Sequence, residues 1–129
     1  KAVKQELERV ENLTKDFNRM TIVLALNYGG RAEIIEAVKK LCKDNSFDLD
    51  SIDEKKFASY LFTSDIPDPD LLIRTSGEMR ISNFLLWQIA YAEIWITQEY
   101  WPDFRKKTLL QALVDFQKRE RRFGDIHSR

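Results

Sequence analysis

A short apolar run that ends in a glycine turn indicates the fold class: Thr21-Ile22-Val23-Leu24-Ala25-Leu26-Asn27-Tyr28-Gly29-Gly30. A continuous β-branched run of this kind is typical of a parallel strand buried on both faces. Apolar residues at helical spacing follow the turn, from Ile34 to Leu41. Strand, turn and helix in this order form half of a βαβ unit. We therefore expect an α/β fold with a mainly parallel sheet flanked by helices.

The rest of the chain supplies further elements of such a fold. Residues 3–20 have the spacing of an amphipathic helix, and Ser51 with Glu54 has the spacing of a capping box ahead of another helix. Two more buried strands are predicted at residues 71–73 and 94–97. A short apolar helix is predicted at residues 84–91, and a last helix at residues 108–123, ended by Gly124.

Composition excludes several classes of protein. The 129 residues suit one domain, and 21 basic against 21 acidic residues argue against a dedicated nucleic-acid binder. The single cysteine cannot form an internal disulfide, and no Cys/His pattern has zinc-ligand spacing, so we expect a cytoplasmic location. No apolar run approaches a membrane span. Because the chain lacks an initiator Met and opens inside a helical pattern, we expect a piece of a longer protein, truncated at the N-terminal side.

The loop at residues 74–82 is the candidate binding site. Ligands in open α/β sheets bind beyond the carboxyl ends of the strands, and this loop follows a predicted strand. It carries the guanidinium groups of Arg74 and Arg80, which match phosphate oxygens, and exposed backbone N–H groups would complete a cradle. The loop also carries three hydroxyls, from Thr75, Ser76 and Ser82. The alternative is that the two arginines form structural ion pairs with Glu78 or Glu93, and the residues alone leave both readings open.

Glu93 stands before a predicted strand in an otherwise apolar neighbourhood. A carboxylate there needs a partner, which is either an arginine or a magnesium ion, since magnesium is commonly held by one or two carboxylates and substrate phosphates. The turn at residues 27–31 has neither the GxGxxG nor the GxxxxGK[ST] spacing, so we interpret it as close packing of a turn on its helix.

Five stretches resemble the motifs of cis-prenyltransferases, most of all the bacterial undecaprenyl diphosphate synthases. The signature-like stretch is Asp70-Leu71-Leu72-Ile73-Arg74-Thr75-Ser76-Gly77-Glu78-Met79-Arg80-Ile81-Ser82-Asn83-Phe84-Leu85-Leu86-Trp87-Gln88. Four others fit in order, at residues 27–31, 91–93, 101–104 and 119–124. The resemblance covers the whole chain but only the C-terminal half of the family's domain. It implies that residues 1–129 are that half and that the family's catalytic Asp lies upstream.

The resemblance implies a Mg²⁺-dependent condensation in which isopentenyl diphosphate is added repeatedly, with cis double bonds, to an allylic diphosphate such as farnesyl diphosphate. In the family, the residues matching Arg74, Arg80 and Ser82 hold isopentenyl diphosphate, and the residue matching Glu93 helps to place magnesium on it. The product is a long-chain polyprenyl carrier lipid, so peripheral contact with a membrane stays open.

The resemblance also implies a homodimer. The segment that contains Arg122 and Gly124 would reach across the dimer interface to the partner's diphosphate. No catalytic residue is expected in this chain, which would supply the isopentenyl diphosphate half-site and be inactive by itself. No nucleic-acid partner is expected.

Two other classes of function remain alternatives. The first is a non-catalytic partner subunit of a heteromeric cis-prenyltransferase. Intact Arg74, Arg80, Ser82 and Glu93 weigh against it, because a partner subunit can lose them. The second is an unrelated nucleotide- or nucleic-acid-binding module, against which the zero net charge and the lack of a P-loop count.

Overall fold

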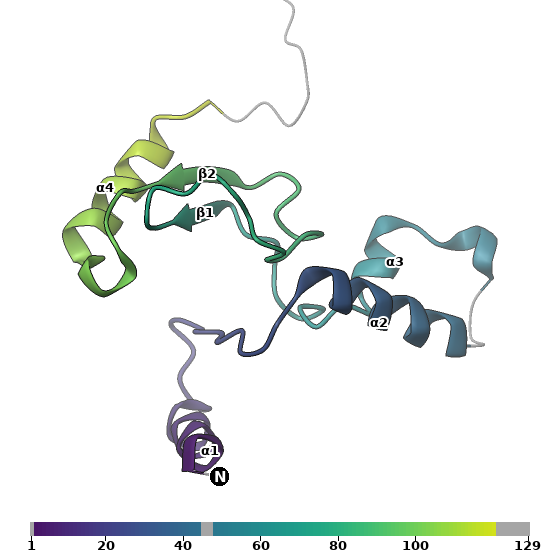
Figure 1. The fold of residues 1–129 in the computed structure, drawn as a ribbon. Coiled ribbons are helices and arrows are strands. Elements are labelled where there is room, and N and C mark those ends of the chain that lie inside the picture. The colour runs from purple at the N-terminus through teal and green to yellow at the C-terminus, as the bar shows by residue number, and fades with distance from the viewer. Residues whose placement is uncertain (1, 45–47, 121–129) are drawn as a thin grey trace, which may run out of the picture.

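The structure is a computed structural model that describes residues 2–44 and 48–120. The elements in chain order are α1 (Ala2–Thr14), α2 (Gly30–Lys43), the 3₁₀ turn η1 (Leu49–Ser51), α3 (Glu54–Ala58), β1 (Leu71–Arg74), β2 (Glu93–Ile96), the 3₁₀ turn η2 (Trp101–Asp103) and α4 (Lys106–Gln117). In Figure 1, α4 lies beside the two strands, α2 and α3 form a second group, and α1 stands apart from both.

The two strands pair in parallel, with Leu71 opposite Glu93 and Arg74 opposite Ile96. The ladder continues one step beyond each strand assignment. The Glu93 N–H donates to the Asp70 carbonyl at 2.9 Å, and the Thr97 N–H donates to the Arg74 carbonyl at 2.9 Å. Parallel strands with flanking helices confirm the expected α/β class, and they set the direction of the loop that follows β1.

Helix α4 is held against β2 by one small residue and two polar contacts. Ala112 is fully buried. The indole N–H of Trp95 donates to Asp115 at 3.0 Å, and this hydrogen bond holds the pKa of the Asp115 carboxyl below its usual range. Arg119, just beyond the end of α4, reaches back to β2 and pairs with Glu93 at 2.7 Å. These contacts fix α4 along the strand that carries Glu93.

A second packed region joins α2 to α3. Ala37, Leu41 and Leu61 are buried, and the Phe57 and Trp87 rings lie 4.5 Å apart between centroids. The expected capping box of Ser51 and Glu54 is wrong, because Asp53 is the N-cap residue and accepts the Lys56 N–H at 2.7 Å, while Glu54 is the first residue of α3. Ser51 belongs to the preceding 3₁₀ turn, where its hydroxyl donates to the Asp48 carbonyl at 2.7 Å.

Two predicted elements are wrong. Residues 21–26 form no strand, and they are exposed, with Ile22 at 73% and Leu24 at 63%. A strand needs a neighbour for its backbone groups, and within the described residues this run has none. Residues 84–91 form turns rather than a helix, and Leu85 has a positive φ of 44°, outside the right-handed helical region.

The ends of the first and last helices also differ from the prediction. Helix α1 ends at Thr14 instead of Met20, and the Phe17 N–H closes a turn on the Thr14 carbonyl at 2.9 Å. Helix α4 begins at Lys106. It ends at Gln117 because the N–H groups of the next two residues, Lys118 and Arg119, donate to carbonyls three residues back, in a tighter turn. The predicted continuation through residues 121–123, and Gly124, lie outside the described residues.

Within the part of the chain that the structure describes, no helix is both long and apolar enough to cross a membrane.

Candidate diphosphate-binding site

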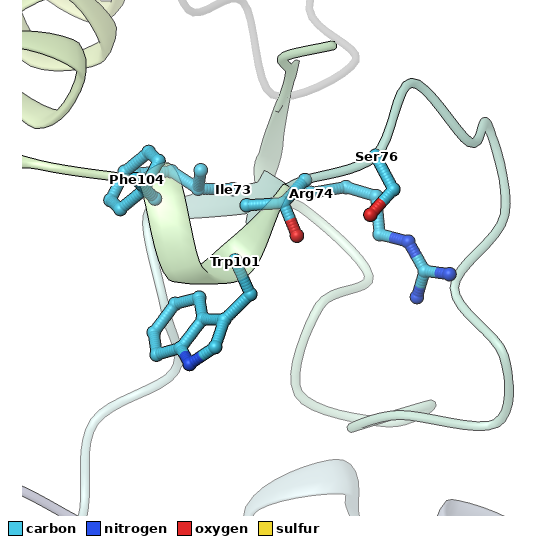
Figure 2. Close-up of a pocket in the computed structure, with 6 residues that line it drawn as sticks. Ile73, Arg74, Ser76, Trp101 and Phe104 are labelled. Atoms are coloured by element: carbon cyan, nitrogen blue, oxygen red, sulfur yellow. The ribbon is translucent and has the colours of Figure 1, made fainter. Parts of the chain in front are cut away.

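A cavity of about 520 Å³ opens at the carboxyl end of β1. It is lined by Ile73, Arg74, Thr75, Ser76, Trp101 and Phe104. Figure 2 shows Trp101 and Phe104 on one side, and Arg74 with Ser76 on the other. The two aromatic rings are stacked with centroids 6.1 Å apart. The cavity therefore combines an aromatic wall with a cationic and hydroxyl-bearing wall, which suits a ligand with an apolar part and an anionic part.

The start of the loop after β1 is fixed by the extension of β2. The Ser76 N–H donates to the Glu99 carbonyl and the Gly77 N–H donates to the Thr97 carbonyl, both at 2.8 Å. Gly77 has a φ of +67°, and a Cβ there would lie 2.2 Å from the Gln98 side-chain oxygen. The expectation that exposed backbone N–H groups complete a phosphate cradle is therefore wrong for Ser76 and Gly77, whose donors are already used.

The two candidate arginines converge on one carboxylate. Arg74 pairs with Glu78 Oε2 at 2.7 Å, and Arg80 pairs with the same oxygen. Arg74 first, and Arg80 in addition, hold the pKa of the Glu78 carboxyl below its usual range. The structure thus shows the ion pairs of the structural alternative. It also shows that both guanidinium groups reach one point, where an anionic group of a ligand can compete with Glu78.

Glu93 lies at the other end of the strand pair from Arg74. It stands opposite Leu71 in the register, three residues below the level of Arg74, which is about 10 Å along a strand. Its carboxylate accepts from Arg119 at 2.7 Å, so an arginine is its partner here. Among the described residues, no group of three or more His, Cys, Asp or Glu side chains is placed to hold a metal ion. The described residues therefore form no metal site from protein groups alone, and the partner of Glu93 in this structure is Arg119.

The remaining predicted site residues are placed only in part. Ser82 is exposed, two positions after Arg80, and has a positive φ of 47°. Arg122 and Gly124 lie outside the described residues, so their proposed reach across a dimer interface stays a prediction.

Sequence reasoning missed a buried polar cluster around Glu33. Glu33 is only 1% exposed, and its carboxylate accepts from the Tyr28 hydroxyl at 2.5 Å, the Phe62 N–H at 2.9 Å and the Gln88 amide at 3.0 Å. Burial, followed by the neighbouring Glu33 carboxylate, raises the pKa of the Tyr28 hydroxyl. The Gln88 amide also donates to Thr63 at 2.8 Å. The cluster joins the first turn of α2 to the end of the signature-like stretch, and nothing local in the sequence pairs residues so far apart.

The glycine turn packs closely, but against residues 83–86 rather than on its own helix as predicted. A Cβ on Gly30 would lie 2.8 Å from Leu86 Cγ and 3.0 Å from the Leu86 backbone nitrogen, and a Cβ on Gly29 would lie 2.8 Å from the Asn83 amide nitrogen. The glycines let the amino end of α2 meet the segment that follows Ser82. A smaller cavity of about 360 Å³ lies at this junction, lined by Arg31, Ile81, Asn83 and Leu86.

The fold agrees with the family to which the chain belongs. Residues 1–124 match the family described as putative undecaprenyl diphosphate synthase, so this chain is a member of the cis-prenyltransferases. It is 54% identical over 126 residues to the isoprenyl transferase of Heliobacterium mobile, covering 95% of this chain and 48% of that protein. It is 51% identical over 125 residues to the isoprenyl transferase of Thermotoga maritima, covering 96% and 54%. The resemblance seen in the sequence is confirmed.

Solved structures give the same result. Lavandulyl diphosphate synthase from Lavandula x intermedia, in complex with dimethylallyl diphosphate, matches with a TM-score of 0.88 and 38% identity, over 95% of this chain and 54% of that one. A probable undecaprenyl diphosphate synthase from Campylobacter jejuni matches with a TM-score of 0.80 and 33% identity, over 96% and 57%. The chain spans about half the length of the curated relatives it matches.

Proposed function

We propose that this chain is the C-terminal half of one cis-prenyltransferase domain and supplies its isopentenyl diphosphate half-site. The complete domain adds isopentenyl diphosphate repeatedly, head to tail, to an allylic diphosphate such as farnesyl diphosphate, and makes a long-chain polyprenyl diphosphate. The observation that carries this proposal is the convergence of Arg74 and Arg80 on a single oxygen of Glu78 at the carboxyl end of β1.

The half-site binds its ligand through charge at one end and apolar contact at the other. When a diphosphate replaces the Glu78 carboxylate, both guanidinium groups donate to its oxygens, and the nearby Ser82 hydroxyl adds a neutral donor. The stacked Trp101 and Phe104 rings form the wall against which the isopentenyl carbons pack. The arginines then hold the nucleophilic double bond in register with the allylic substrate, and that positioning lowers the barrier.

Three further elements belong to the proposal. The active form is a homodimer, in which Arg122 and Gly124 reach the partner's diphosphate. Magnesium takes part as a cation carried by the diphosphate. Glu93 is its candidate protein ligand, although in this chain that carboxylate is bound to Arg119, so no step of the binding scheme depends on the metal.

Calorimetric titration of the chain with isopentenyl diphosphate tests the half-site. Arg74→Ala and Arg80→Ala should each weaken binding by about 1.5–3 kcal/mol, the usual contribution of a hydrogen bond to a charged group. Glu78→Gln should strengthen binding, because it removes the carboxylate that competes for both arginines. The matched control is Arg9→Ala, since Arg9 pairs with Glu6 on the remote helix α1. Unchanged affinity in both arginine variants contradicts the proposal.

The chain alone is expected to bind but not to condense its substrates. Only one of the two diphosphate sites is proposed to lie here, and effective molarity is lost when the allylic substrate is not held. A radiolabelled isopentenyl diphosphate assay with magnesium and both diphosphates should show turnover only when the N-terminal half of a cis-prenyltransferase domain is present. Turnover by residues 1–129 alone would place the catalytic group within this chain.

A further inference from the structure

Asn83 caps the amino end of α2 from outside that helix. The Gly30 N–H donates to the Asn83 backbone carbonyl at 2.8 Å, and the Arg31 N–H donates to the Asn83 side-chain oxygen at 2.9 Å. The first N–H groups of a helix have no partner inside it, and the N-cap residue Gly29 offers no side chain to satisfy them. One residue, 52 positions further along the chain, therefore supplies two of the missing acceptors.

The junction is shaped for this contact on both sides. Asn83 has a positive φ of 63°, a backbone conformation that asparagine tolerates better than most residues. On the α2 side, the two glycines leave room, since a Cβ on Gly29 would lie 2.8 Å from the Asn83 amide nitrogen and one on Gly30 would meet Leu86. The buried Glu33 carboxylate holds Gln88, five residues further along the same segment, at 3.0 Å. Residues 83–88 are thus attached to the first turn of α2 at two points.

Different elements position the two candidate arginines. Arg74 is the last residue of β1, so the strand sets its position. Arg80 and Ser82 lie outside the strand, three residues and one residue before Asn83. We call Arg74, Arg80 and Ser82 together the diphosphate cradle. The position of Arg74 depends on β1, whereas the position of Arg80 and Ser82 depends on α2.

We propose that Asn83 is a positioning residue for the diphosphate cradle: its bonds to α2 hold the Arg80–Ser82 side at the distance from Arg74 that a diphosphate requires. This inference rests on the proposed function, and it adds a residue that touches no ligand atom. Because the side-chain oxygen of Asn83 accepts the Arg31 N–H, an aspartate in its place keeps the contact.

The test compares two replacements at the same position. Asn83→Gly keeps the positive φ and the backbone carbonyl but removes the side-chain acceptor, whereas Asn83→Asp keeps the acceptor. The dissociation constant of the chain for isopentenyl diphosphate, from calorimetry, should rise about tenfold in the glycine variant, equivalent to about 1.4 kcal/mol. In the aspartate variant it should lie between the parent and glycine values, because the acceptor is kept while the added carboxylate repels the diphosphate. Inorganic diphosphate should follow the same order, because the cradle holds the diphosphate group.

Asp53→Gly is the matched control. It removes the side-chain cap of α3, which accepts the Lys56 N–H at 2.7 Å, and so causes a similar local loss away from the arginines. Both glycine variants should lower the urea midpoint of unfolding, but only Asn83→Gly should change the dissociation constant. A lower midpoint with unchanged affinity in Asn83→Gly would make Asn83 a structural cap alone and overturn the proposal.

Amide hydrogen exchange separates this inference from the proposed function. Asn83→Gly should speed exchange at Arg31 and along residues 79–83, and Asn83→Asp should not. Unchanged exchange in the glycine variant would overturn the inference, whatever the ligand does. A parent chain that binds neither isopentenyl diphosphate nor inorganic diphosphate would contradict the proposed function, and the positioning role would fall with it.

Discussion

Replacing Glu93 and Arg119 by glutamine, singly and together, measures how strongly their ion pair anchors α4 to β2. The two side chains meet at 2.7 Å, and they are 30% and 33% exposed. Arg119 also donates to the Ile94 carbonyl at 3.0 Å, which fixes its guanidinium on the strand. Fully exposed pairs contribute about 0.2–1 kcal/mol, and hydrogen bonds to charged groups about 1.5–3 kcal/mol. Because a third of each side chain is exposed, we expect a coupling of about 1 kcal/mol.

Urea unfolding of the parent chain, the two single variants and the double variant gives this coupling free energy directly. The charge-reversed pair, Glu93→Arg with Arg119→Glu, should recover part of the stability that either single reversal loses. The matched control is the pair of Glu36 and Lys39 on α2, whose charged atoms are 3.7 Å apart and whose side chains are 48% and 62% exposed. Its coupling should be below about 0.5 kcal/mol.

A coupling at Glu93 no larger than that of the control pair would refute this reasoning. The carboxylate would then be available for the magnesium role that the family resemblance implies. A titration with magnesium and isopentenyl diphosphate decides that case. A rise in the unfolding midpoint that occurs in the parent but not in Glu93→Gln would assign the carboxylate to the metal instead of Arg119.

Three further outcomes are expected. The Trp95 N–H lowers the pKa of the Asp115 carboxyl, which adds stability that is present above the unfolded pKa and lost as the pH falls through the folded pKa. Asp115→Asn should therefore make the urea midpoint of unfolding depend less on pH below about pH 4. Gly30→Ala should lower the free energy of unfolding in urea by about 1–3 kcal/mol, since its Cβ would lie 3.0 Å from the Leu86 backbone nitrogen. We expect the turn region that ends at Tyr91, 69% exposed, to lie at the two-fold interface of the proposed homodimer. Light scattering at micromolar concentration should therefore show a dimer that Tyr91→Arg disrupts, and a monomeric parent would contradict this.

The strands could be predicted from the sequence to within a residue because their signal is local. Apolar runs at residues 71–73 and 94–97 mark the two buried segments. The exact ends are not local, since β1 gains Arg74 and β2 gains Glu93 through pairing with each other. Ladder hydrogen bonds depend on the partner's register, and no residue pattern within one strand records where its neighbour begins.

The site shows the same division between local and distant information. The sequence identified Arg74 and Arg80 from their residue type and from their place after a strand, and the structure brings them to one carboxylate. It could not identify Asn83, because that contact joins positions 52 residues apart. The glycine pair at the start of α2 did predict close packing at that point. A glycine shows that a neighbour lies close, but it does not identify which residue that neighbour is.

The strand predicted at residues 21–26 does not form, and the exposure of these residues gives the physical reason. The run is exposed on both of its faces, with Val23 at 58% and Leu24 at 63%. A strand at the edge of a sheet would show one apolar face, whereas a run that is apolar at every position is suited to burial between two layers and two neighbours. Helix α4 likewise exposes Leu110 and Val114 on the face turned away from β2. Exposed apolar surface on separate elements is what half of a domain leaves uncovered. The chain spans about half the length of the curated relatives it matches, and among the described residues the run at 21–26 has no neighbouring strand. The strand prediction failed because a strand forms only where a neighbour pairs with its backbone groups.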